Sequence, residues 1–341
     1  MSSIYTRVAG TGHHVPAQVV TNDDLSARIN TSDAWIRERT GIHARRFSQP
    51  GESTSELATH AAQHALRDAG LEASDLDLII FATLSPDYFF PGSGVLLGAQ
   101  LNIPGVPALD VRNQCSGFLY GLQCADAMIR SGVHRRILLV GAEVHSTGLD
   151  FSDEGRDIAV LFGDGAGAFV LEAASGDDIQ PDQRSPGVLG VLLGADGRHA
   201  KALWCHSPAS SQFPTRLTAD NLARREHFPA MQGRTVFKHA VTTMRDTVLA
   251  LLEQLNMSLG QVDMLIPHQA NLRISALVQK SLGLPDDRVF NNIERYGNTT
   301  AASLPIAVDE CRRLGRLDEG ALLCMVAFGS GFTWGAALIR M

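Results

Sequence analysis

The feature that most constrains the fold of this chain is a helix–turn–strand pattern that occurs twice. Residues 64–83 predict a helix, a turn and a short apolar strand, and residues 248–268 predict the same series. Both apolar runs are short and bounded by turn residues, which is typical of buried strands in α/β proteins. The chain is therefore expected to contain two related α/β units.

Two further pairs of segments support this duplication. Arg136–Ala142 is similar to Ala321–Ala327, and Phe162–Leu171 is similar to Phe328–Leu338. In both halves of the chain they follow the first pair in the same order, so the repeated stretch is long enough to be a whole α/β unit. Chance similarity of apolar strands is the alternative, but three matched pairs favour two copies of one unit.

The duplication suggests where the chain divides. We expect an N-terminal half over residues 1–175 and a C-terminal half over residues 186–341, joined by a stretch rich in Gly, Asp, Ser and Pro. Residues 197–233 have no equivalent in the first half, which predicts an insertion. Such a segment can form the wall of a pocket, or it can be a plain surface loop.

Composition excludes several classes of protein. The net charge of −7 and the absence of a long basic run argue against a nucleic-acid partner. No apolar stretch is long enough to span a bilayer, and the first residues lack a signal-peptide pattern. Five scattered cysteines predict neither a disulfide framework nor a zinc site. These features predict a cytoplasmic protein without stable membrane insertion or a bound metal.

Cys115 is the first candidate for chemistry. An apolar run ends near Val111, and a helical pattern begins at about Gly117, so Cys115 lies where a strand turns into a helix. The partial positive charge of a helix N-terminus stabilises a thiolate, which predicts a lowered pKa and a nucleophilic sulfur. The alternative is a buried structural cysteine.

Three further segments carry candidate groups. His268 follows a predicted strand and can serve as a general base or as a hydrogen-bond donor, or it can be a packed core residue. Asn298 lies among glycine and small residues, where it offers amide donors or simply caps a turn. The glycine-rich segment 328–335 permits close backbone approach, so one of its N–H groups and that of Cys115 can hold an oxyanion.

These motifs together resemble the β-ketoacyl-acyl-carrier-protein synthase III family. Asn-Gln-Cys-Ser-Gly-Phe, Pro-His-Gln-Ala-Asn, Gly-Asn-Thr and the final glycine loop occur in the order and approximate spacing of that family, over essentially the whole chain. The resemblance implies an α/β thiolase fold, a five-layer α-β-α-β-α architecture of two pseudo-symmetric halves. It also implies a homodimer.

The resemblance also implies a reaction. Cys115 would take an acyl group from acyl-CoA, while the backbone N–H groups of Cys115 and Ser330 stabilise the oxyanion. His268 and Asn298 would then bind the thioester carbonyl of malonyl-acyl carrier protein as it loses carbon dioxide. The product is a β-ketoacyl thioester, which initiates fatty acid or related acyl-chain synthesis. No permanently bound cofactor is implied, because coenzyme A thioesters are substrates.

Other positions take roles by local similarity alone. The residues implied to bind coenzyme A and its pantetheine arm are Trp35, Arg39, Arg156 and Phe237. Phe90 matches a residue of the acyl pocket, and Lys238 and Arg273 match basic positions that dock the acidic carrier protein. Without the resemblance, Trp35 would be read as a packing residue and the basic pair as solvated charges.

Three departures, one of which is the insertion at residues 197–233, and four alternatives accompany this interpretation. Arg112-Asn-Gln114 precedes the nucleophile where acetyl-using members carry small residues, so we expect a primer larger than acetyl. Ser330 replaces a glycine but keeps its backbone N–H. A polyketide-type condensing enzyme and a nondecarboxylating acyltransferase share these groups. A non-enzymatic acyl-binding protein is expected to lack the cysteine, as a thiolase is expected to carry a second one in the last loop.

Overall fold

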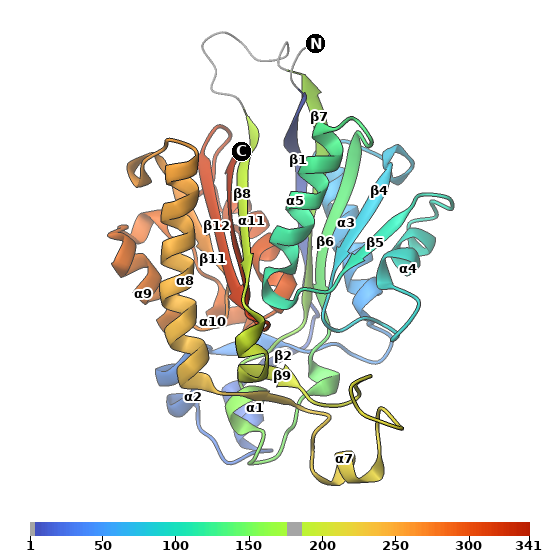
Figure 1. Cartoon of the computed structure of the whole chain (residues 1–341), viewed down its shortest axis with the longest axis vertical. Coiled ribbons are helices and arrows are strands. Elements are labelled where there is room, and N and C mark those ends of the chain that lie inside the picture. The colour runs from blue at the N-terminus through green and yellow to red at the C-terminus, as the bar shows by residue number, and fades with distance from the viewer. Residues whose placement is uncertain (1–3, 176–185) are drawn as a thin grey trace.

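The computed structural model describes residues 4–175 and 186–341, and it builds them around two larger β-sheets (Figure 1). The five-stranded sheet has the order β1-β7-β6-β4-β5. β4 pairs in parallel with β5 and β6, whereas β7 runs antiparallel to both β6 and β1. Its strands are β1 (Ile4–His14), β4 (Leu78–Ala82), β5 (Ala108–Val111), β6 (Arg136–Glu143) and β7 (Gly165–Ser175).

The four-stranded sheet repeats this arrangement in the order β11-β12-β13-β8. β11 and β12 are parallel, and β13 runs antiparallel to both β12 and β8. A fifth strand is reduced to one parallel bridge between Leu265 and Val289, beside β11, where β5 lies beside β4 in the first sheet. The strands are β8 (Gly187–Ala195), β11 (Met264–Pro267), β12 (Leu322–Gly329) and β13 (Thr333–Arg340).

The sheets confirm the predicted fold class. The similar segments occupy equivalent strands, since β4 corresponds to β11, β6 to β12 and β7 to β13. The order and the relative directions of these strands agree between the two sheets. The predicted linker includes residues 176–185, which lie outside the described residues.

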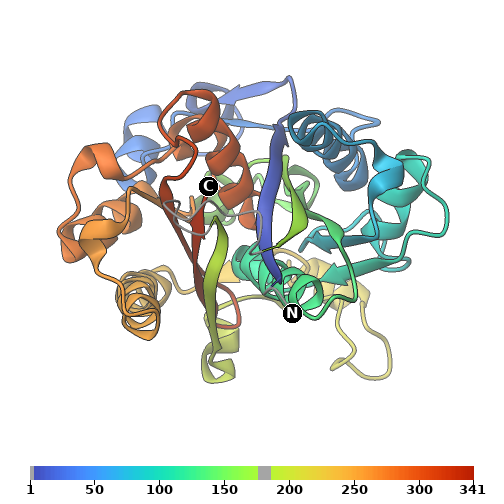
Figure 2. The same cartoon turned by 90° about the horizontal axis from the view of Figure 1, so that it is seen from above.

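Helices complete the layers (Figures 1 and 2). α5 (Gly117–Arg130) and α11 (Ser303–Arg313) contact strands of both sheets and form the central layer. α3 (Thr54–Ala69) and α4 (Ser93–Gln100) cover the outer face of the first sheet, and α8 (Gly233–Gln254) and α9 (Leu272–Leu282) cover the second. Buried residues of the central layer, such as Phe118, Leu122 and Leu304, pack on both sheets, because both helix faces exclude water there.

The remaining elements surround one end of the sheets (Figure 1). They are β2 (Val19–Thr21), α1 (Asn22–Ser26), α2 (Asp33–Thr40), β3 (Ala44–Arg46), α6 (Arg156–Ala159), β9 (Leu203–Cys205), α7 (Ala219–Ala223), β10 (Pro229–Met231) and α10 (Ile293–Tyr296). The segment predicted as an insertion contributes β9 and β10, which pair with each other, and α7.

A capping residue and two short 3-10 turns precede the helices that approach the site. Asn271 caps α9 by accepting a hydrogen bond from the Arg273 N–H, and the αL residue Gly283 ends that helix. A short 3-10 turn over Gln114–Ser116 (η2) precedes α5, and another over Thr300–Ala302 (η8) precedes α11. Both turns therefore deliver residues to the ends of the central helices.

Gly141 of β6 allows η8 to lie directly against the first sheet. A Cβ atom at this position would lie 2.4 Å from the Ala301 carbonyl oxygen and 3.2 Å from the Ala302 Cα. Backbone atoms of a buried turn cannot move aside cheaply, because interiors are close-packed. The absence of a side chain at Gly141 thus sets the distance between β6 and the start of α11.

We expect Gly141→Ala to lower the free energy of unfolding by about 1–3 kcal/mol, because the added methyl group overpacks this contact. The measurement is urea denaturation followed by circular dichroism. Gly197→Ala is the matched control, since a Cβ there meets no atom within 4 Å. Equal stability of the two variants would contradict the packing argument.

Candidate functional site

Cys115 lies in η2, between the end of β5 and the start of α5. Its side chain is buried, with 7% of its surface exposed. Gly329, the last residue of β12, packs against it so closely that a Cβ there would lie 2.9 Å from the sulfur. The thiol therefore lies where the two sheets of the molecule meet.

Burial raises the pKa of the Cys115 thiol to about 12, and the carboxylate of Glu143 acts in the same direction. The backbone N–H groups of Cys115 and Ser330 oppose this shift. The expectation of a lowered pKa is wrong for the protein without substrate, because desolvation outweighs the stabilisation at the helix end. The same two N–H groups are those predicted to hold an oxyanion.

His268 follows β11, and its backbone N–H donates to the Val326 carbonyl oxygen over 2.7 Å. Its Nδ1 bonds the Ser303 hydroxyl over 2.6 Å, while its buried Nε2 has no hydrogen-bond partner in the described residues. When Ser303 donates to Nδ1, Nε2 carries the proton. Burial lowers the pKa of His268 to about 3, so the ring is a neutral donor at physiological pH.

The carboxamide of Asn298 is oriented by its own backbone turn. Its Oδ1 accepts a hydrogen bond from the Thr300 N–H over 2.9 Å, and its backbone N–H donates to the Leu161 carbonyl oxygen over 2.8 Å. Because Oδ1 is occupied, Nδ2 is the part of the amide that is available to a ligand. The side chain is 6% exposed.

These three side chains line one cavity of about 290 Å³, which we call the His268 cavity. Trp35, Arg39 and Phe237 line the same cavity, so the structure brings together six of the predicted site residues. A space of this shape, with apolar walls and a few polar groups, suits a small-molecule ligand.

Cationic side chains flank the aromatic residues of the His268 cavity. The guanidinium carbons of Arg39 and Arg156 lie 4.5 Å and 4.6 Å from the ring centre of Trp35. The guanidinium carbon of Arg273 lies 5.8 Å from the ring centre of Phe237. Such contacts are attractive, because the ring face carries negative charge. Lys238 is exposed on α8, outside the cavity lining.

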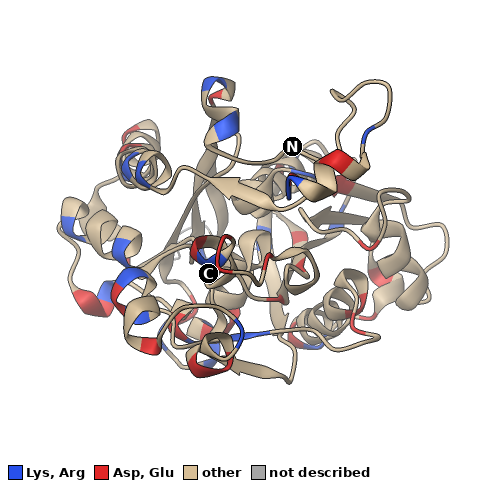
Figure 3. Cartoon of the chain, turned by 90° about the horizontal axis from the view of Figure 1, so that it is seen from below, with Lys and Arg blue, Asp and Glu red and all other residues tan. Residues whose placement is uncertain are grey.

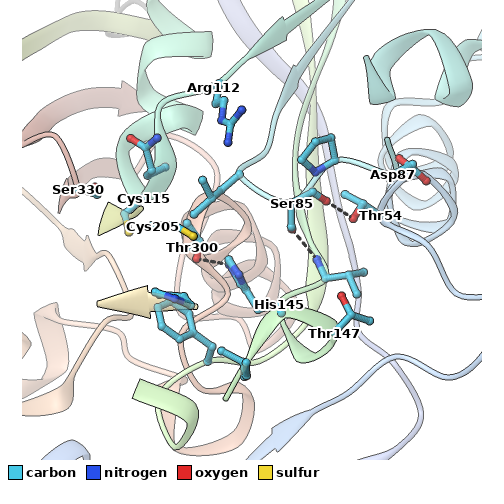
Figure 4. A pocket seen from close by; sticks show the side chains of 18 of the residues that line it. Thr54, Ser85, Asp87, Arg112, Cys115, His145, Thr147, Cys205, Thr300 and Ser330 are labelled. Carbon is cyan, nitrogen blue, oxygen red and sulfur yellow. Dashed lines mark hydrogen bonds between the residues drawn. The ribbon is translucent and has the colours of Figure 1, made fainter. Parts of the chain in front are cut away.

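Cys115 also borders a second space of about 720 Å³, which we call the Arg112 cavity (Figure 4). Ser330 lines it, as do Leu203 and Trp204 of β9 and Pro229 of β10. The remaining wall includes Ser85, Asp87, Arg112, Gln114, His145, Thr147 and Thr300. Cys115 thus lies between two spaces of different size and lining, and Ser330 borders the larger one.

Phe90 lies apart from the other predicted site residues. Its side chain is 78% exposed and lies outside the linings of both cavities, beside the exposed residues Tyr88 and Phe89. The loop after β4 lines the Arg112 cavity from Leu84 to Asp87 but not at Phe90, so Phe90 does not line an acyl pocket within its own chain. Similarity of a short segment to the family does not show which way the Phe90 side chain points.

The described residues show neither of two other kinds of site. Residues 4–175 and 186–341 contain no group of three or more His, Cys, Asp or Glu side chains that could hold a metal ion. Over the same ranges, the helices are too short or too polar to cross a lipid bilayer.

Sequence reasoning missed the residues that support the site. Ser303 orients His268, and Thr300 orients Asn298. Glu143 and His145 lie on the far side of Thr300. The sequence offered two signals: Glu143 is a charged residue at the end of an apolar run, and Thr300 lies two residues from Asn298. The contacts of Ser303 with His268 and of His145 with Thr300 join residues distant in sequence.

The layered, duplicated fold defines the class of the protein, that of the thiolase-like enzymes. Residues 109–197 match the family described as 3-oxoacyl-[acyl-carrier-protein] synthase III, and residues 252–341 match the C-terminal part of that family. The chain is 45% identical to beta-ketoacyl-[acyl-carrier-protein] synthase III of Rhodospirillum rubrum, over 98% of each protein. The chain belongs to this synthase III family.

Two further relatives agree. The synthase III of Methylococcus capsulatus is 44% identical over 99% of each protein. The crystal structure of 3-oxoacyl-[acyl-carrier-protein] synthase III from Aquifex aeolicus superimposes with a TM-score of 0.87 at 40% identity, over 98% of this chain and all of that chain.

Neutral burial of His268 predicts an effect of pH on stability. An ordinary histidine takes up a proton below its pKa of 6.5 in the unfolded chain, whereas His268 stays neutral to about pH 3 when folded. The folded protein therefore loses stability as the pH falls below 6.5. Between about pH 7 and about pH 5.5, we expect the wild type to lose about 1 kcal/mol more than His268→Gln. Urea denaturation of both proteins at the two pH values measures the difference, and parallel losses would contradict it.

Proposed function

We propose that this protein, an acyl-condensing transferase, joins an acyl group from acyl-CoA to a malonyl group carried by acyl carrier protein, with loss of carbon dioxide. The supporting observation is that Cys115 lies between two cavities, with two neutral hydrogen-bond donors across the smaller one. The product is a β-ketoacyl thioester, and the reaction initiates fatty acid synthesis.

In the first half-reaction, the Cys115 sulfur attacks the thioester carbonyl of acyl-CoA. The backbone N–H groups of Cys115 and Ser330, which already interact with the sulfur, stabilise the tetrahedral oxyanion. Coenzyme A leaves as a thiol, so the proton of Cys115 is transferred as the acyl group arrives. The raised pKa implies that the thiol loses this proton during the attack and not before it.

In the second half-reaction, the malonyl thioester enters the His268 cavity. Nε2 of His268 and Nδ2 of Asn298 donate hydrogen bonds to its carbonyl oxygen, and loss of carbon dioxide leaves an enolate. The enolate carbon attacks the acyl group on Cys115, whose sulfur departs. A histidine with a pKa near 3 suits this role, because it stabilises negative charge without giving up a proton.

The outer part of the His268 cavity suits coenzyme A. An adenine base can stack on Trp35 in place of one of its two guanidinium neighbours, and the other can remain near the phosphates. Phe237 would line the passage for the pantetheine arm. The chemistry draws on protein groups alone, so we propose no permanently bound cofactor.

The carrier protein would dock where Lys238 and Arg273 are exposed, on α8 and α9. Figure 3 shows basic residues on the side of the molecule where these helices lie. A local basic surface on a chain with a net charge of −7 attracts an acidic partner by electrostatic steering.

We also propose a homodimer, supported by the exposed edge strand β5. A cytoplasmic location remains a prediction of the sequence.

Acyl transfer tests the proposed nucleophile. We expect wild-type protein mixed with acyl-CoA to gain the mass of one acyl group, and Cys115→Ala to gain none, because the thioester needs the sulfur. Intact-protein mass spectrometry measures the gain. His268→Ala and Asn298→Ala should still be acylated but should release little carbon dioxide from malonyl-carrier protein. A Cys115→Ala protein that condenses at the wild-type rate would refute the proposal.

The Arg112 cavity supports a primer longer than acetyl. Its volume of about 720 Å³ lies within the range of sites that enclose drug-sized ligands, which exceeds what a two-carbon group fills. We expect octanoyl-CoA to acylate Cys115 at least about 10-fold faster than acetyl-CoA, since each buried methylene adds binding energy. Thr147→Phe, which narrows this cavity, should remove the preference. Faster acylation by acetyl-CoA would exclude a long primer.

A further inference from the structure

Among the buried carboxylates that the reaction does not use, that of Glu143, at the end of β6, lies nearest to the turn that carries Asn298 and Thr300. Its side chain is fully buried and accepts hydrogen bonds from the Ser85 hydroxyl over 2.6 Å and the Ser85 N–H over 3.0 Å. The N–H of Leu84 lies 3.1 Å away, and that of Ala301 lies 3.4 Å away. Because a buried charge is costly unless it is well bonded, this carboxylate anchors the groups around it firmly.

His145 links that anchor to the start of the second central helix. Its Nε2 bonds the Thr300 hydroxyl over 2.5 Å, a bond that Figure 4 shows. The same nitrogen lies 3.8 Å from the Glu143 carboxylate. Its backbone N–H donates to the buried Asp164 carboxylate over 2.7 Å. Glu143 and His145 thus hold Thr300 and Ala301 from one side, by a hydroxyl and a backbone N–H.

Thr300 needs such support, because its φ angle is +48°. A β-branched residue rarely adopts this left-handed conformation, and surrounding contacts must impose it. In this conformation the Thr300 N–H points at Oδ1 of Asn298, 2.9 Å away. The strained backbone at Thr300 therefore decides which end of the Asn298 carboxamide faces the cavity.

We propose that Glu143, His145 and Thr300 form a positioning chain that keeps Nδ2 of Asn298 directed at the substrate. This inference rests on the proposed function, in which Asn298 donates to the enolate oxygen. Without the chain, the carboxamide can rotate and present Oδ1, an acceptor, to a developing negative charge. The chain serves the decarboxylation half-reaction and not the acylation of Cys115.

The two half-reactions provide the test. We expect His145→Ala and Thr300→Ala to slow condensation with malonyl-carrier protein by about 10- to 100-fold, and to slow it at least about 10-fold more than they slow Cys115 acylation. Thr300→Ser and His145→Gln retain a hydroxyl or an amide N–H at the bonded position, and they should recover most of the condensation rate.

Thr215→Ala is the control, because Thr215 is exposed and lines neither cavity. It should leave the ratio of the two rates unchanged. An equal loss of both half-reactions in His145→Ala and Thr300→Ala would show a general structural role and overturn the inference, as would unchanged condensation. Absence of acylation in the wild type would instead count against the proposed function.

Discussion

Close contact between the two halves of the chain is the constraint on which the rest of the structure depends. Gly329 of the second sheet touches Cys115, and Gly141 of the first sheet touches the turn before α11. Each contact requires a residue without a side chain, because interiors are packed to the density of organic crystals. The duplicated architecture thereby brings a sulfur from one half against donors from the other, and the cavities form where these contacts end.

Burial sets the protonation states of the polar groups at this junction, as much as their hydrogen bonds do. Desolvation keeps both the Cys115 thiol and the His268 imidazole neutral when no substrate is bound. Neutral donors bind the thioester carbonyl without a fixed charge beside it, and they meet negative charge on its oxygen as carbon dioxide leaves. Preorganised donors are worth most under these conditions, since little water competes with them.

The sequence predicted the fold and the three central side chains because both leave local traces. Repeated apolar runs mark equivalent strands, and Cys115, His268 and Asn298 each lie in a short, distinctive segment. The supporting contacts leave no such trace: Ser303 lies 35 residues from His268, and Thr300 lies 155 residues from His145. The direction of Phe90 and the pKa of Cys115 depend on what surrounds them in space, which residue spacing does not encode.

The reduction of the fifth strand in the second half limits how copies of this chain can associate. Beside β11, the bridge at Val289 takes the place of a full strand, whereas β5 keeps a free edge in the first half. An edge strand can recruit another strand through its unpaired backbone groups. If two copies pair their β5 strands about a two-fold axis, each β5 edge is covered by the other, so this one contact closes on itself and does not extend into a filament.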